Sequence, residues 1–233
     1  MDKEILVAMR RDLHTMMRQV HERVQELDDT LKALYEKEES VEELFDYSLI
    51  DQWTARFPIK KFGYKALQEE QKELYVSILA SLITLNPHSL KCTQQLVVIN
   101  KIRNMMRLPR TLEEILVRSR KVCQADYQEL ALLVNQKGYR YKCRFIYDAL
   151  LVVSVAGNTE QDELKSVAIL AADIGIDVPT VKSIMLCVEA HLCGRIRYMA
   201  KEEKNRFQRV ATLFLDKEFV EKLVRRRYKK NNQ

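Results

Sequence analysis

Apolar residues recur at heptad spacing through residues 1–45. One series falls at every seventh position from Leu6 to Val41, and a second series lies between its members. The seam that the two series form is apolar from Leu13 to Leu34: Leu13, Met17, Val20, Val24, Leu27, Leu31 and Leu34. A seam of this length predicts a coiled coil, because its side chains leave water only by inserting into a facing helix. We therefore expect residues 1–45 to form a long helical arm.

The heptad pattern does not by itself identify the partner of the seam. In a parallel dimer, Arg23 would face Asp28 and Lys37 would face Glu42, and both pairs have opposite charge. These pairs favour a homodimer or a hetero-complex formed through the arm. The alternative is that the apolar stripe packs against the protein's own second domain.

The rest of the chain alternates helical patterns with short interruptions, which predicts an all-α fold. Only 5 Gly and 4 Pro occur in 233 residues, so few positions favour turns. A capping box at Thr111 and Glu114, Asn86 before Pro87, and Gly138 each predict a helix end. We expect an ordered connector over 46–63 and a helical bundle over 64–233. The helices predicted in this bundle cover about 64–85, 88–106, 111–121, 124–137, 141–156, 159–175, 177–198 and 203–230.

Two stretches of the predicted bundle follow the same plan. Each has an apolar helix, a tight turn containing asparagine, and a second amphipathic helix. An offset of 71 positions overlays the apolar residues of the second helices, Leu96, Val98 and Ile99 on Val167, Ile169 and Leu170. The matching helical phase favours a pseudo-symmetric bundle.

The second of these stretches carries a family pattern. The run 148–156, which is mainly apolar after Asp148, ends at Gly157-Asn158. Glu163-Leu164 follows on the next helix, and Ile169-Leu170-Ala171 leads to Ile174-Gly175-Ile176. This pattern resembles the tellurite-resistance B (TerB-like) domain family, mainly over residues 140–185. The resemblance implies an all-helical, pseudo-symmetric bundle. It also implies a place in a bacterial stress-response or defence assembly.

The same resemblance raises the question of a metal site. Members of the family often have an acidic residue before the turn glycine, and acidic clusters in some of them bind metal, but here that position is Ala156. Glu160, Asp162 and Glu163 remain as weak candidates. Acidic residues at a helix start are accounted for by the helix dipole, whereas hard cations need several convergent oxygens. We therefore expect no metal and no cofactor, and keep a metal-responsive TerB-like domain as the second alternative function.

Positive charge gathers at the C-terminus. The formal net charge is +6 with a pI near 9.0, and the last predicted helix carries Arg225, Arg226, Arg227, Lys229 and Lys230. These side chains complement the helix dipole and could also bind an anionic partner. A nucleic-acid-associated protein is therefore the first alternative function. The mixed basic and aromatic segment 137–145 is interpreted as a helix entry, with its tyrosines packed and its Arg and Lys side chains in solvent.

The sequence points away from catalysis. It contains no Gly-rich phosphate loop, no G-x-S-x-G and no H-E-x-x-H motif, and we expect no enzymatic activity. Cys187 and His191 lie one helical turn apart, but no second ligand pair accompanies them, so we interpret them as structural. The five scattered cysteines, the acidic N-terminus and the lack of a long apolar run predict a cytoplasmic protein. The leading hypothesis is a non-enzymatic scaffold or adaptor that mediates protein–protein assembly.

Overall fold

The computed structural model describes residues 44–60, 62–157, 159–196 and 201–230. All regular structure in these ranges is helical, as the sequence predicts. The α-helices are α2 (Tyr47–Arg56), α3 (Glu69–Ser81), α4 (Leu90–Met106), α5 (Leu112–Ser119), α6 (Gln124–Lys137), α7 (Tyr139–Ser154), α8 (Gln161–Asp173), α9 (Val178–Cys193), α10 (Lys204–Ala211) and α11 (Lys217–Lys230), with short 3-10 turns at Tyr64–Ala66 and Lys201–Glu203. No helix within these ranges has both the length and the apolar character needed to cross a bilayer.

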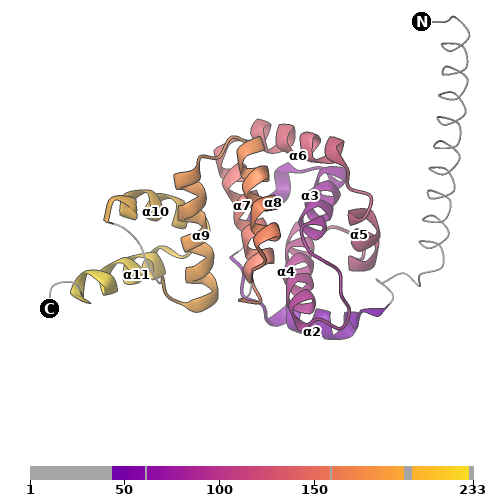
Figure 1. The fold of residues 1–233 in the computed structure, drawn as a ribbon, viewed down its shortest axis with the longest axis horizontal. Helices are drawn as coiled ribbons and strands as arrows, with labels where there is room; N and C mark the ends of the chain where they lie inside the picture. The colour runs from indigo at the N-terminus through magenta and orange to yellow at the C-terminus, as the bar shows by residue number, and fades with distance from the viewer. Residues whose placement is uncertain (1–43, 61, 158, 197–200, 231–233) are drawn as a thin grey trace, which may run out of the picture. The chain divides into compact units, whose positions relative to one another are not determined.

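Helix α7 lies at the centre of the bundle (Figure 1). It packs against α3, α4, α6, α8 and α9. All residues from Cys143 to Val153 are buried, because a helix surrounded on every side has no face left for solvent. The sequence reflects this position in the unbroken apolar run from Ala149 to Val153.

Local capping signals decide several helix ends. The Thr111 N–H donates to Glu114 Oε2 at 2.7 Å, and the Glu114 N–H donates to Thr111 Oγ1 at 3.1 Å, which confirms the predicted capping box. Gly138 ends α6 with φ of 87°, a left-handed value that glycine adopts without steric cost. Asp177 caps α9 by accepting from the Thr180 N–H at 2.9 Å.

Four of the predicted helices have wrong boundaries. The helix predicted over 64–85 is shorter, because α3 begins at Glu69 and ends at Ser81. Asn86 does not cap α4, because Ser89 occupies the N-cap and accepts from the Cys92 N–H. Helix α9 ends at Cys193 rather than near 198, with Gly194 in the left-handed region. The predicted helix over 203–230 is two helices, α10 and α11, separated by residues 212–216. Phe214 and Leu215 are buried within this break. Leaving the helical path places these two large apolar side chains in the core, which is favourable.

The predicted connector contains a helix of the bundle. Helix α2 packs against α4, with Ile50 and Thr54 buried between them. Asn100 on α4 donates through Nδ2 to Asp51 Oδ1 at 2.8 Å and to Thr54 Oγ1 at 3.1 Å. Phe45 is buried as well, and residues 44–233 form one compact unit. The predicted coiled-coil arm lies outside the described residues, apart from its last two positions.

The two stretches with similar sequence plans become two helix pairs. Helix α3 packs against α4, and α7 packs against α8. Leu96, Ile99, Val167 and Leu170 are all buried, as matching phases require. Ile169, however, is 62% exposed, whereas its counterpart Val98 is fully buried. The sequence repeat therefore predicts the order of the helices better than it predicts which of the matched residues are buried.

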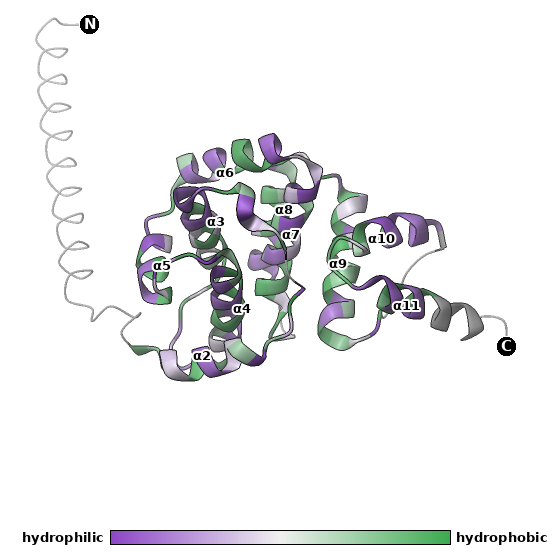
Figure 2. Ribbon diagram, turned by 180° about the vertical axis from the view of Figure 1, so that it is seen from behind, coloured by the Kyte–Doolittle hydropathy of each residue, from purple (hydrophilic) through white to green (hydrophobic). Residues whose placement is uncertain are grey.

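The C-terminal helices are the most polar part of the described chain. In Figure 2, purple dominates α10, whereas α9 is mainly green. Each C-terminal helix still has a narrow apolar face, with Phe207 and Val210 buried on α10 and Val220 and Val224 buried on α11. These faces hold the helices on the body, and α10 packs against α9.

Candidate functional site

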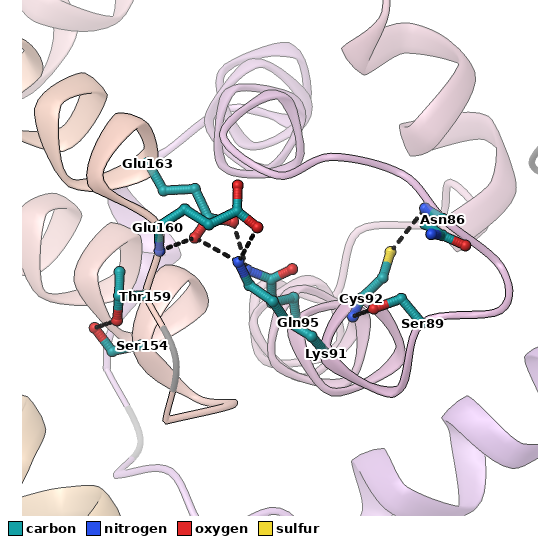
Figure 3. Close-up of polar contacts among 9 residues, drawn as sticks. All are labelled: Asn86, Ser89, Lys91, Cys92, Gln95, Ser154, Thr159, Glu160 and Glu163. Carbon is teal, nitrogen blue, oxygen red and sulfur yellow. Dashed lines mark hydrogen bonds and ion pairs between the residues drawn. The ribbon is translucent and has the colours of Figure 1, made fainter.

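Two of the three predicted metal candidates meet at a lysine. Lys91, in the first turn of α4, places Nζ 2.8 Å from Glu160 Oε1 and 2.9 Å from Glu163 Oε2 (Figure 3). Gln95, one turn further along α4, donates to Glu163 Oε1 at 3.0 Å. Glu163 also accepts from the Glu160 N–H at 3.1 Å and so closes a capping box at the start of α8. The cluster ties the beginnings of α4 and α8 together.

The cation between these carboxylates belongs to the protein itself. The side chain of Glu163 is 6% exposed and that of Lys91 is 22% exposed, so the pair is largely shielded from water. Burial opposes the charge on Lys91, but hydrogen bonds to Glu160 and Glu163 outweigh it and raise the pKa of Lys91. Its ammonium therefore stays charged and occupies the position that a metal ion would need.

Asp162 takes no part in this cluster. Its side chain is 90% exposed and pairs with Lys165 at 2.8 Å. In the described part of the chain, no group of three or more His, Cys, Asp or Glu side chains is arranged to hold a metal ion. The geometry of Glu160 and Glu163 fits an ion pair with Lys91 and offers little to a metal-responsive function.

A second polar cluster lies entirely inside the bundle. Arg144 and Asp148 on α7 are 1% and 0% exposed, and Arg144 Nε lies 2.9 Å from Asp148 Oδ1. The hydroxyl groups of Tyr64 and Tyr75 donate to Asp148 Oδ2 at 2.7 and 2.8 Å. Burial, followed by the charge of Asp148, raises the pKa of both tyrosines, so both phenols remain hydrogen-bond donors.

Aromatic rings enclose the arginine of this cluster. The Arg144 guanidinium carbon lies 5.1 Å from the ring centre of Phe62, 5.6 Å from that of Tyr64 and 5.3 Å from that of Tyr147. Rings at this distance stabilise a cation whose hydration has been removed. Because neither Arg144 nor Asp148 reaches solvent, a substrate has no direct access to their charges. The arrangement fits a structural role.

For one residue of segment 137–145 the prediction is wrong. The sequence predicts Arg144 in solvent, yet Arg144 is among the most buried side chains of the described chain. Its partner one turn later was the available signal, because an Arg and an Asp four residues apart share a helix face. The expectation for the tyrosines is met only in part, since Tyr139 is 51% exposed while the Tyr141 hydroxyl donates to the Gly63 carbonyl at 2.8 Å.

Cys187 and His191 have separate partners. The Cys187 thiol is buried and donates to the Ser183 carbonyl at 3.1 Å, and burial raises its pKa. His191 Nδ1 lies 2.6 Å from the Tyr147 hydroxyl, and its ring stacks on Phe57 with centres 6.0 Å apart. Burial lowers the pKa of His191. A neutral imidazole can accept a hydrogen bond from the Tyr147 hydroxyl at Nδ1, so the arrangement favours the uncharged ring.

Two other sets of predicted site residues have side chains that the structure does not describe. The seam from Leu13 to Leu34 falls outside the described residues. Helix α11 includes Arg225, Arg226, Arg227, Lys229 and Lys230 in its backbone, but the structure does not describe their side chains. Oligomerisation through the seam and anion binding by the basic cluster therefore remain predictions.

Comparisons with known proteins do not assign the chain to a family. Family models, curated proteins and solved structures were compared with it, and none matches. The resemblance of residues 140–185 to the TerB-like domain remains a prediction from the sequence. Any function has to be inferred from the protein's own residues.

Proposed function

We propose that the protein is a non-enzymatic scaffold or adaptor that assembles with protein partners through its N-terminal heptad seam. The observation that carries the proposal is the apolar seam from Leu13 to Leu34 in the sequence. Seven apolar side chains in a/d register need a facing surface, since exposing them to water is unfavourable. A second copy fits, because Arg23 then meets Asp28 and Lys37 meets Glu42.

The helical body supports a display role. Its two polar clusters, around Arg144 and around Lys91, are internally paired and link helices to one another. The stress-response or defence setting rests on the TerB-like resemblance alone.

Light scattering tests the homodimer directly. At tens of micromolar, the full-length chain should have the mass of a dimer, and residues 44–233 alone should give a folded monomer. Val24→Asp with Leu31→Asp should also give a monomer, because an unpaired charge in a buried seam is strongly destabilising. Gln19→Asp with Gln25→Asp adds the same charge at outward heptad positions and should remain a dimer.

The other outcomes are equally informative. A full-length monomer at these concentrations overturns the homodimer, and paired pull-downs with the wild-type and Val24/Leu31 chains then test the hetero-complex. If removing residues 1–43 instead abolishes the cooperative thermal melt of the body, the stripe packs on the protein's own second domain. That result would contradict the proposal.

A further inference from the structure

An open groove is lined by α2, by Phe57, Pro58, Ile59 and Phe62, and by the C-terminal half of α4. Its volume is about 880 Å³. Phe57, Ile59 and Met105 line it with apolar surface, and each of them is partly exposed. Arg56, Lys101 and Arg107 line it with positive charge. The groove thus combines apolar contacts with a cationic border.

The cations of the groove retain binding capacity. Within the described chain, no carboxylate pairs with Arg56 or Arg107, and both side chains are exposed. Lys101 donates to the Thr54 and Ala55 carbonyls at 2.9 and 3.3 Å. One of the three protons of its ammonium group is then left to donate to a ligand. The carboxylate on the groove, Asp51, already accepts from Asn100 Nδ2. The groove therefore presents more positive than negative charge to a ligand.

Arg107 occupies its position at a conformational cost. It ends α4 with φ of 54° and ψ of 42°, and it is the one non-glycine residue in the described ranges with positive φ. Glycine is the usual residue at such a helix end, because a side chain there clashes with the backbone. An arginine at this site gives up local stability and places a guanidinium on the groove.

We propose that this groove binds a short acidic segment of a partner protein that carries a large apolar side chain. Guanidinium groups pair with carboxylates through two parallel hydrogen bonds, so Arg56 and Arg107 select for acidic residues. The apolar side chain packs on Phe57, Ile59 and Met105. The groove is open rather than enclosed, which fits an extended peptide better than a small molecule that needs most of its surface buried. Because residues 51–107 supply the whole lining, this binding does not depend on the arm.

Selection from a displayed random peptide library tests the proposal on the full-length protein. Enriched sequences should contain Asp or Glu next to Leu, Met, Phe or Trp. An enriched peptide labelled with fluorescein should then bind in an anisotropy titration. Arg56→Gln and Arg107→Gln should each weaken its binding about tenfold, as expected for the loss of one charge-assisted contact. Arg209→Gln removes an equal charge from an exposed site on α10 and should leave the affinity unchanged.

Arg107→Gly separates binding from folding. Glycine relieves the left-handed backbone, so the melting temperature should stay equal or rise while peptide affinity falls about tenfold. Enriched peptides without acidic residues would overturn the proposal. Peptide affinities that stay unchanged in the Arg56 and Arg107 variants would overturn it as well. A single-stranded oligonucleotide could also displace the labelled peptide. If it did so more strongly than unlabelled acidic peptide, and only when Arg56 and Arg107 are present, the proposal would also be overturned.

Discussion

Arg144 and Asp148 form an ion pair one helical turn apart on α7, with Arg144 Nε 2.9 Å from Asp148 Oδ1 and almost no exposure of either side chain. Tyr64 and Tyr75 both donate to Asp148 Oδ2 from outside α7. The pair therefore joins the central helix to α3 and to the turn before it. A buried pair of this kind is costly to break, because the remaining partner is left charged without compensation.

Removing one member of this pair should destabilise the protein strongly. We expect Arg144→Met and Asp148→Asn each to lower the free energy of unfolding by about 3–5 kcal/mol, measured by urea denaturation. The double variant Arg144→Met/Asp148→Leu should lose less than the sum of the single losses, since no unpaired charge remains. Arg110→Met, which breaks the solvent-accessible pairs of Arg110 with Glu114 and Glu73, serves as the control and should have a much smaller effect. Single-variant losses below that of the control would contradict the structural role.

Protonation of His191 should weaken the fold. Burial lowers the pKa of His191 in the folded state, so the unfolded chain, with a pKa near 6.5, binds the proton more readily. The contribution of the neutral ring is thus complete above about pH 6.5 and is lost as the pH falls toward the folded pKa.

The matching measurement is urea denaturation between about pH 5 and pH 8. His191→Gln should flatten the loss of stability on the acidic side, because it removes the group that titrates. His88→Gln changes an exposed histidine and should leave the pH profile as it is. Identical profiles for the wild type and His191→Gln would show that the ring does not couple folding to pH.

The two lysine–carboxylate pairs at the start of α8 should contribute different amounts to the stability of the fold. Lys91→Met leaves the buried carboxylate of Glu163 without its ammonium partner and should cost about 1–3 kcal/mol. Lys165→Met breaks the pair with Asp162, whose side chains are 62% and 90% exposed, and should cost about 0–1 kcal/mol. Thermal and urea unfolding of the two variants side by side provide the measurement. Equal losses would mean that the Lys91 cluster contributes no more than a surface pair.

Nucleic-acid binding through the C-terminus should be weak and sensitive to salt. Lys and Arg residues that neutralise phosphates release counterions, so affinity falls steeply as salt rises. At about 150 mM salt we expect dissociation constants of roughly 10⁻⁴ to 10⁻⁶ M for DNA and RNA, measured by fluorescence anisotropy. Removal of residues 225–233 should abolish this binding and leave the melting temperature unchanged. Submicromolar binding at that salt concentration would favour the nucleic-acid alternative over the scaffold.

Helix positions were largely predictable because their signals are local. The capping box at Thr111 and the helix end at Gly138 each depend on a few neighbouring residues, and both form as the sequence predicts. Prediction failed where a distant contact decided the outcome. The break after Ala211 accompanies the burial of Phe214 and Leu215 in the core.

The sequence by itself determined the all-helical class and most helix ends, since periodicity and capping are properties of neighbouring residues. Only the tertiary structure decided which charges are buried and which partners reach them from other helices. Lys91 meets Glu160 and Glu163 across about 70 positions of chain, and Tyr64 reaches Asp148 across 84. It also brought Arg56 and Arg107 to one groove. The reason is physical: the free energy of a charge depends on burial and on neighbours that folding brings together, and neither is encoded in local spacing.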